Sequence, residues 1–281
     1  MLPLLQQSND RRIEQKNERT KEGSKKQATV MTDKKGKFFW TNLGKPKDGK
    51  VSDGKIEIKT SGQTHVFRRK LEERIAANAP FYFRKVKGDF ECTVKVLVPK
   101  TKMKTWLDQC GILVQEKRGI YAKVALEYQK PPSHQEDDLK YYVAAYVHDA
   151  DTMKHESEGK TPYPGQYSAG DKNYNYELLE GGQQLEDALW LRLSRLSGWV
   201  EAEYSFNGED WKQLKAARFS EAEQFSVGLF SSSPGADNIG FKAVFTDFLI
   251  DQEYVDYEVD ADEDDSEAYE AGESAALSED A

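Results

Sequence analysis

Residues 90–98 read Phe-Glu-Cys-Thr-Val-Lys-Val-Leu-Val and directly follow the turn residues Gly88 and Asp89. Apolar side chains occupy every second position from Phe90 to Val98, and Glu, Thr and Lys stand between the first four of them. Successive side chains of a β-strand point to opposite faces of its sheet. The alternation therefore predicts a strand with one buried and one solvated face, which is typical of antiparallel sheets.

The same pattern recurs along the middle of the chain, with turn residues between the runs. The other runs lie at residues 56–60, 112–114, 121–128, 141–147, 189–193, 200–204, 225–229 and 241–245. The Asn207-Gly208 pair after the sixth of these is the strongest hairpin signal in the chain. Helical periodicity is scarce. We therefore predict an all-β fold for residues 37–250, an antiparallel β-sandwich of jelly-roll type.

The two ends differ from this middle part in charge. Residues 1–36 hold nine Lys/Arg and five Asp/Glu, whereas residues 251–281 hold fourteen Asp/Glu and no Lys/Arg. The chain as a whole carries −9, so residues 37–250 are left with a net charge of +1. We expect residues 1–36 to be a disordered arm and residues 251–281 to be a disordered acidic tail. The tail either keeps the protein soluble or docks on a basic partner.

Several classes of protein are excluded by composition. No apolar run approaches the roughly 18 residues that a membrane span needs, and the apolar start of the chain is too short for a signal peptide. The basic residues of the arm are interspersed with Glu, which argues against a nucleic-acid partner. Cys92 and Cys110 both lie in strand-like runs, so we expect two buried free thiols and a cytoplasmic protein.

Residues 148–188 interrupt the strand pattern. They are rich in Tyr and in Gly and Pro, and their strand signal is weak. Loops of this length are uncommon in compact domains and are usually functional or disordered. We therefore expect a long loop here that is either part of the function or a cover over the sheet.

Short strings in a fixed order along residues 38–250 carry a family resemblance. They are Asn78-Ala79-Pro80, Gly88-Asp89-Phe90-Glu91, the residues 108–113, the residues 123–127, Trp190-Leu191-Arg192-Leu193, Asn207-Gly208 with Trp211, and Val227-Gly228-Leu229. In this order they resemble the family of the regulation-of-enolase protein, domain of unknown function 1349, which has the concanavalin A-like lectin/glucanase fold. The resemblance implies a ligand on the concave sheet and, by the family name only, enolase as a partner. It implies no activity, because a fold does not establish one.

Candidate binding residues follow from the period-two pattern. Lys123, Ala125 and Glu127 share one strand face, and Trp190 shares a face with Arg192 on another strand. A face that combined the candidate residues would suit sugar hydroxyls, because charged groups supply paired hydrogen bonds and the indole supplies a flat platform. The candidates are Asp108, Lys123, Glu127, Trp190, Arg192 and Ser205. The alternative is a solvated ladder of cross-strand ion pairs, each worth roughly 0.2–1 kcal/mol.

Catalysis is less well supported than binding. Glycosidases place two carboxylates about 5–5.5 Å or roughly 6.5–9.5 Å apart, and the Glu-x-Asp-x-x-Glu pattern of glycosidases with this fold is not found in any predicted strand. His148, Asp149, Asp151 and His155 match no zinc or EF-hand spacing, so we predict no metal site and no cofactor. We therefore predict a non-catalytic binding or regulatory protein with a carbohydrate or protein partner. A cryptic glycoside hydrolase and a pure protein-interaction module remain the alternatives.

Overall fold

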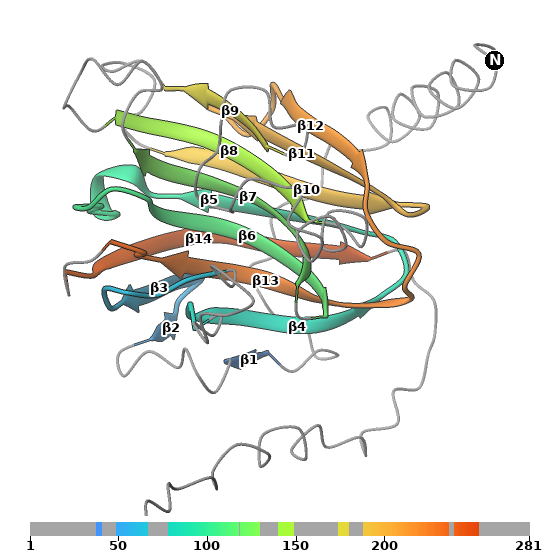
Figure 1. Cartoon of the computed structure of the whole chain (residues 1–281), viewed down its shortest axis with the longest axis horizontal. Helices are drawn as coiled ribbons and strands as arrows, with labels where there is room; N and C mark the ends of the chain where they lie inside the picture. Colours follow the sequence, from blue (N-terminus) through green and yellow to red (C-terminus); the bar gives the residue numbers. More distant parts are fainter. Residues whose placement is uncertain are drawn as a thin grey trace, which may run out of the picture.

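The computed structural model describes residues 38–40, 49–66, 78–117, 119–129, 140–148, 174–179, 188–235 and 239–252. Apart from one turn of 3-10 helix, η1 (Val98–Lys100), every described element is a β-strand. The strands form two antiparallel seven-stranded sheets that pack into a sandwich (Figure 1). The predicted all-β antiparallel sandwich is thereby confirmed. No helix in the described ranges is long and apolar enough to cross a membrane.

The first sheet, sheet A, has the strand order β1-β4-β13-β6-β7-β8-β9. Its strands are β1 (Phe39–Trp40), β4 (Phe81–Lys87), β13 (Gln224–Ser232), β6 (Asp108–Lys117), β7 (Ile120–Gln129), β8 (Lys140–His148) and β9 (Tyr174–Leu178). Strand β9 lies inside the stretch predicted as a long loop, and it pairs with β8 through Tyr174 and Tyr146. Residues 149–173 and 180–187 of that stretch lie outside the described residues.

The second sheet, sheet B, has the order β12-β11-β10-β5-β14-β3-β2. Its strands are β12 (Lys212–Arg218), β11 (Trp199–Ser205), β10 (Leu189–Leu196), β5 (Phe90–Val96), β14 (Phe241–Gln252), β3 (Lys55–Thr60) and β2 (Lys50–Ser52). Strand β14 continues to Gln252 and so includes the first two residues of the predicted acidic tail. The rest of that tail and the whole predicted arm lie outside the described residues.

The main core fills the space between the two sheets. In β5, the residues from Phe90 to Val96 alternate between buried and partly exposed, as their sequence pattern predicts. Val124 of β7 in sheet A and Leu191 of β10 in sheet B are both fully buried in the same cluster. Burying a side chain of this kind stabilises the fold by about 1.5–3 kcal/mol. Cys92 and Cys110 also lie in this core and are free thiols, as predicted.

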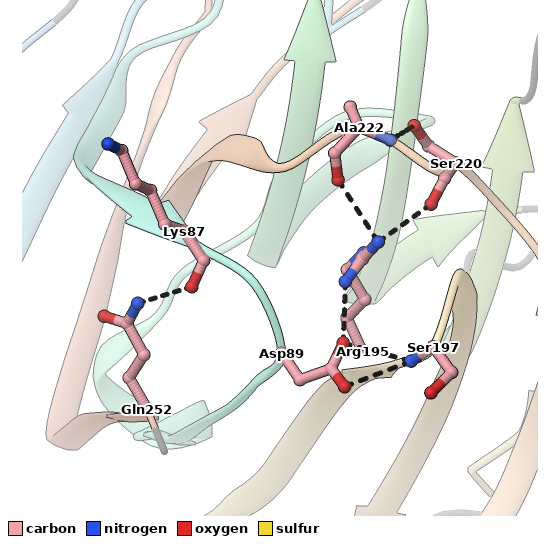
Figure 2. A network of polar contacts seen from close by, with 7 residues as sticks. All are labelled: Lys87, Asp89, Arg195, Ser197, Ser220, Ala222 and Gln252. Atoms are coloured by element: carbon pink, nitrogen blue, oxygen red, sulfur yellow. Dashed lines mark hydrogen bonds and ion pairs between the residues drawn. The ribbon is translucent and has the colours of Figure 1, made fainter. Parts of the chain in front are cut away.

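Arg195 of β10 holds one end of the sandwich together (Figure 2). Its guanidinium donates to the carboxylate of Asp89 at 2.6 Å and to the carbonyl oxygens of Ser220 and Ala222 at 3.1 and 3.2 Å. The same carboxylate accepts from the backbone N–H of Ser197 at 3.0 Å. Asp89 lies between β4 and β5, and the two carbonyls lie between β12 and β13, so one side chain joins two connections that pass from sheet to sheet.

The predicted hairpin at Asn207-Gly208 joins β11 to β12, which pair as antiparallel neighbours. The connection covers residues 206–211 and is therefore longer than a two-residue turn. The Asn207 side-chain oxygen accepts from the backbone N–H groups of Glu209 and Asp210, each at 2.9 Å. Gly208 has a φ of +81°, the left-handed conformation that favours glycine.

Candidate functional site

The face of sheet A that points away from sheet B has a floor of small residues. Gly111 of β6, Ala125 of β7 and Ala144 of β8 lie side by side in register across three strands. Phe230 of β13 continues this row at one end, and Tyr176 of β9 continues it at the other. We call this face the A-face. Aromatic residues therefore flank a floor of small residues on this face.

Lys123 and Glu127 lie on the A-face on either side of Ala125. Because the residue between them on that face carries only a methyl group, the two long side chains meet, with Lys123 Nζ 2.7 Å from Glu127 Oε1. Lys123 Nζ also donates to Oε1 of Gln109, which lies opposite Glu127 on β6. Lys123 and Glu127 are each only 1% exposed. A buried ion pair carries a large desolvation cost, so it is a weak contributor to stability.

Tyr174 and Gln129 complete this polar cluster. The Tyr174 hydroxyl donates to Glu127 Oε2 at 3.0 Å, and Gln129 Nε2 lies 2.8 Å from that hydroxyl and 3.3 Å from the same carboxylate oxygen. Burial raises the pKa of Tyr174 well above its usual value, and the Glu127 carboxylate raises it further. Tyr174 is therefore a neutral hydrogen-bond donor at physiological pH.

Aromatic rings surround the cluster on β8 and β9. The rings of Tyr142 and Tyr176 meet edge to face with centroids 5.8 Å apart, and Tyr174 lies 5.3 Å from Tyr176. Tyr146 lies 6.4 Å from Tyr174. The resulting surface combines flat apolar rings with hydroxyl, amide, ammonium and carboxylate groups. Sugar rings are recognised by this combination of groups.

Exposure divides the A-face into a deep part and a rim. Ala125 and Ala144 are 0% exposed, and Tyr142 is 2% exposed. Tyr176 and Gln129 are partly exposed. On the β4 side, Val66 and Ala79 pack on the face with Phe81 and Phe230. A ligand would therefore first contact the rim, with the Lys123–Glu127 pair beneath it.

The structure does not bring the six sequence-predicted site residues together. Lys123 and Glu127 lie on the A-face, whereas Trp190, Arg192 and Ser205 lie on the outer face of sheet B, on the opposite side of the sandwich. The predicted combined face is therefore wrong. The period-two pattern places side chains correctly within one strand, but it does not say to which of two sheets the strand belongs.

The sheet B residues form a packed ladder. The Arg192 guanidinium lies 4.0 Å from the centre of the Trp211 ring, and its Nε donates to the carboxylate of Glu203, its cross-strand neighbour, at 2.6 Å. Trp190 packs beside Gly208, where an added Cβ would lie 2.9 Å from the indole. This part of the molecule fits the ion-pair ladder that was the alternative to a binding face.

Asp108 belongs to neither face. Its carboxylate accepts from the backbone N–H groups of Lys104 and Thr105 at 2.7 and 2.9 Å, and from the Ser233 hydroxyl at 2.6 Å. It is 0% exposed. Asp108 therefore fixes the loop before β6 against the end of β13, and the surrounding donors satisfy its charge.

Sequence reasoning missed much of the A-face. Gln109 lay in one of the strings that carried the family resemblance, and the tyrosines of β8 and β9 lay in Tyr-rich stretches, but nothing indicated that these segments join β7 in one sheet. Glu127 is the only acidic residue that the described strands contribute to the A-face. In the described part of the chain, no group of three or more His, Cys, Asp or Glu side chains could hold a metal ion.

Several solved structures are similar to this chain. A functionally unknown protein from Saccharomyces cerevisiae is similar at a TM-score of 0.55 and 17% identity, over 78% of this chain and 97% of that one. A legume lectin-like domain from Entamoeba histolytica has a TM-score of 0.44 and 13% identity, over 79% of this chain and 90% of that one. The GH43 BlXynB protein from Bacillus licheniformis also has a TM-score of 0.44 and 13% identity, over 75% of this chain and 39% of that one.

No curated protein matches the chain. A family model described as "Protein of unknown function (DUF1349)" matches residues 40–137 and 177–253. The matched segments contain β6 and β7, and hence Gln109, Lys123 and Glu127 of the A-face. Since they make up more than half of the sequence, the chain belongs to the DUF1349 family.

Proposed function

We propose that this protein is a non-catalytic binding protein that takes a carbohydrate on the A-face. One observation carries the proposal: a buried Lys123–Glu127 pair lies beside a floor of small residues and beneath a rim formed by Tyr176 and Gln129. A sandwich of this size does not need a buried ion pair on the outer side of one sheet for its stability. A buried group whose pKa is strongly shifted by burial and by a charged partner, as for Tyr174 beside Glu127, is a candidate for a functional site.

The chemistry of the rim favours a sugar over an apolar ligand. Tyr176 offers a ring face, and Gln129 offers an amide beside the Tyr174 hydroxyl. A sugar ring has an apolar face for the aromatic ring and hydroxyl groups that both donate to and accept from the amide. The Lys123–Glu127 pair below holds Gln109, Gln129 and Tyr174 in place.

Hydrolysis is the less supported function. A glycosidase uses a pair of carboxylates, and the described strands bring only Glu127 to the A-face. Enolase, which only the family resemblance suggested, has no support among the contacts of the described residues and is not part of the proposal. The buried free thiols Cys92 and Cys110 support a reducing compartment such as the cytoplasm.

A glycan array followed by calorimetry tests the proposal with three variants of the full chain. Tyr176→Ala and Gln129→Ala remove rim groups, and we expect each to weaken glycan binding about tenfold, the equivalent of about 1.4 kcal/mol. Trp190→Ala is the matched control, because it removes an aromatic ring on the outer face of sheet B and should leave the affinity unchanged.

The outcomes separate the candidate functions. Binding lost in Trp190→Ala but kept in Tyr176→Ala would move the site to sheet B and overturn the proposal. If no glycan binds, the protein is better described as a protein-interaction module, and the proposal is wrong. Release of product sugar from a bound glycan would replace binding by hydrolysis. Circular dichroism of each variant shows whether a loss of affinity comes from loss of the fold.

A further inference from the structure

A second surface feature is independent of the A-face. An open pocket of about 820 Å³ lies between the start of β14, the end of β3 and the segment that follows η1. Five lysines line it: Lys59, Lys100, Lys102, Lys104 and Lys242. We call it the lysine groove. Among the residues that the structure describes, no acidic residue lines it.

Two of the lysines face each other across strands. Lys59 of β3 and Lys242 of β14 are directly opposite in register. Like charges in this position repel and are destabilising. Glu57 offsets part of the repulsion, since its Oε2 lies 3.5 Å from Lys242 Nζ, but its other oxygen already pairs with Lys55. The register therefore brings two like charges together at the floor of the lysine groove.

The other three lysines stand on a firmly anchored segment. Lys100, Lys102 and Lys104 are exposed and alternate with Thr101 and Met103, which are buried. The Thr101 hydroxyl accepts from the backbone N–H of Val244 at 3.0 Å, and Asp108 accepts from the N–H of Lys104 at its other end.

The segment is not a regular strand. Lys100 is the last residue of η1, and the backbone N–H of Met103 donates to the carbonyl oxygen of Thr101 at 3.3 Å. Among the described residues, no carboxylate forms an ion pair with Lys100, Lys102 or Lys104. The segment therefore presents three exposed cations at alternate positions.

We propose that the lysine groove docks the acidic end of this same chain, with Glu263, Asp265 and Glu267 opposite these three lysines. These three acids also stand at alternate positions of the sequence. Residues 253–281 hold thirteen Asp/Glu and no Lys/Arg, which makes this segment the complement of the groove in charge.

Chain length allows the contact within one molecule. From Lys242 to Gln252, β14 runs ten residues, or about 33 Å away from the groove. A segment that returns from Gln252 needs about ten extended residues to cover that distance, which it reaches near residue 263. Because the segment stays attached to β14, its contact with the groove is intramolecular. An acidic segment from another molecule must therefore compete with the chain's own.

Zero-length carbodiimide cross-linking of the full chain tests the contact, with peptides identified by mass spectrometry. We expect monomeric products in which Lys100, Lys102 or Lys104 is joined to an acid between residues 263 and 267. Their yield should drop at least tenfold at about 1 M salt, because the Debye length is then only about 3 Å. The variant Glu263→Gln/Asp265→Asn/Glu267→Gln should lose these products to the same extent.

A matched pair of lysine variants gives the second arm. A labelled peptide of residues 258–270 is titrated into the full chain that carries the three neutralised acids. Lys102→Glu/Lys104→Glu should weaken peptide binding at least tenfold, whereas Lys85→Glu/Lys117→Glu, which reverses two exposed lysines away from the groove, should not. Cross-links spread evenly over all surface lysines would overturn the proposal, as would groove cross-links found only between two copies. So would a groove that binds inorganic phosphate or a short RNA but not the peptide.

Discussion

Lys123 and Glu127 lie four residues apart on β7, and their charged atoms meet at 2.7 Å on the same side of the strand as Ala125. Their side chains are 0% and 2% exposed. In a strand, such a contact requires two long side chains and a small residue between them, because positions four apart are about 13 Å apart along the backbone. The pair holds Gln109, Gln129 and Tyr174 together through shared hydrogen bonds.

The first prediction concerns the loss of one partner of this pair. Glu127→Gln removes the negative charge but keeps the shape, and it leaves the buried Lys123 ammonium without its counter-charge. We expect the free energy of unfolding to fall by about 3–5 kcal/mol, measured by urea denaturation. The double variant Lys123→Met/Glu127→Leu should be near wild type in stability, because it removes both desolvated charges. An unfolding curve of Glu127→Gln that coincides with that of the wild type would contradict this account.

The second prediction concerns alkaline pH. The pKa of Tyr174 is raised well above 10.0, first by burial and then by the Glu127 carboxylate, so the folded state holds the phenolic proton more tightly than the unfolded state. The unfolded state loses this proton first, so the contribution to stability is constant below pH 10 and decreases as the pH rises above it. Urea midpoints measured between about pH 8 and pH 11 should fall in the upper half of that range.

Tyr174→Phe is the control for that decrease. It removes the titrating group but keeps the ring, so stability should be lower at neutral pH, through the lost hydrogen bonds to Glu127 and Gln129, and should fall less steeply above pH 10. Tyr141 and Tyr204 also have pKa values raised by burial, so part of the decrease should remain. An identical slope in both proteins would exclude Tyr174 as its source.

The fold could be predicted from the sequence because the information is local. In each run, such as residues 90–98, the alternation of apolar and polar residues predicts which side chains are buried. In β5 and β10 this prediction matches the burial residue by residue. Strand β9, Tyr-Asn-Tyr-Glu-Leu, alternates as strictly as the other strands, but it is only five residues long. It was missed because it stands alone in a stretch of the sequence that is rich in Gly and Pro.

The candidate site could be predicted only in part, because sheet membership is not local. The alternation correctly places Lys123 with Glu127 and Trp190 with Arg192. It does not reveal that β7 belongs to sheet A and β10 to sheet B, so one predicted face became two faces on opposite sides of the molecule. Asp108 lies on neither of these two faces. Its role as an anchor depends on Ser233, which is far away in sequence.

The third prediction concerns the Arg195 contact network. Arg195→Lys keeps the charge but cannot reach Asp89, Ser220 and Ala222 together, and it loses the planar contact 4.7 Å above the Phe225 ring. We expect a loss of about 1–3 kcal/mol in the free energy of unfolding, since the part-buried carbonyls of Ser220 and Ala222 lose a charged donor.

The exposed pair of Arg218 and Glu221 gives the matched control for Arg195. Their side chains are 71% and 69% exposed, so the pair is screened by solvent. Arg218→Lys should therefore change stability by less than about 0.5 kcal/mol. Equal effects of the two substitutions on thermal unfolding would show that the Arg195 contacts do not hold the sheet connections together.

The fourth prediction separates backbone strain from side-chain contact at two glycines. Gly88 and Gly208 have φ values of +70° and +81°, but an added Cβ at Gly88 meets nothing within 4 Å, whereas at Gly208 it lies 2.9 Å from the Trp190 indole. Gly88→Ala should cost only the left-handed strain of about 1–2 kcal/mol. Gly208→Ala should cost more and should shift the tryptophan fluorescence, because the indole must move. In Trp190→Ala/Gly208→Ala the additional cost should disappear, and the double-mutant cycle should return an interaction energy above about 0.5 kcal/mol. If the two effects simply add, the contact between Trp190 and this hairpin does not exist in solution.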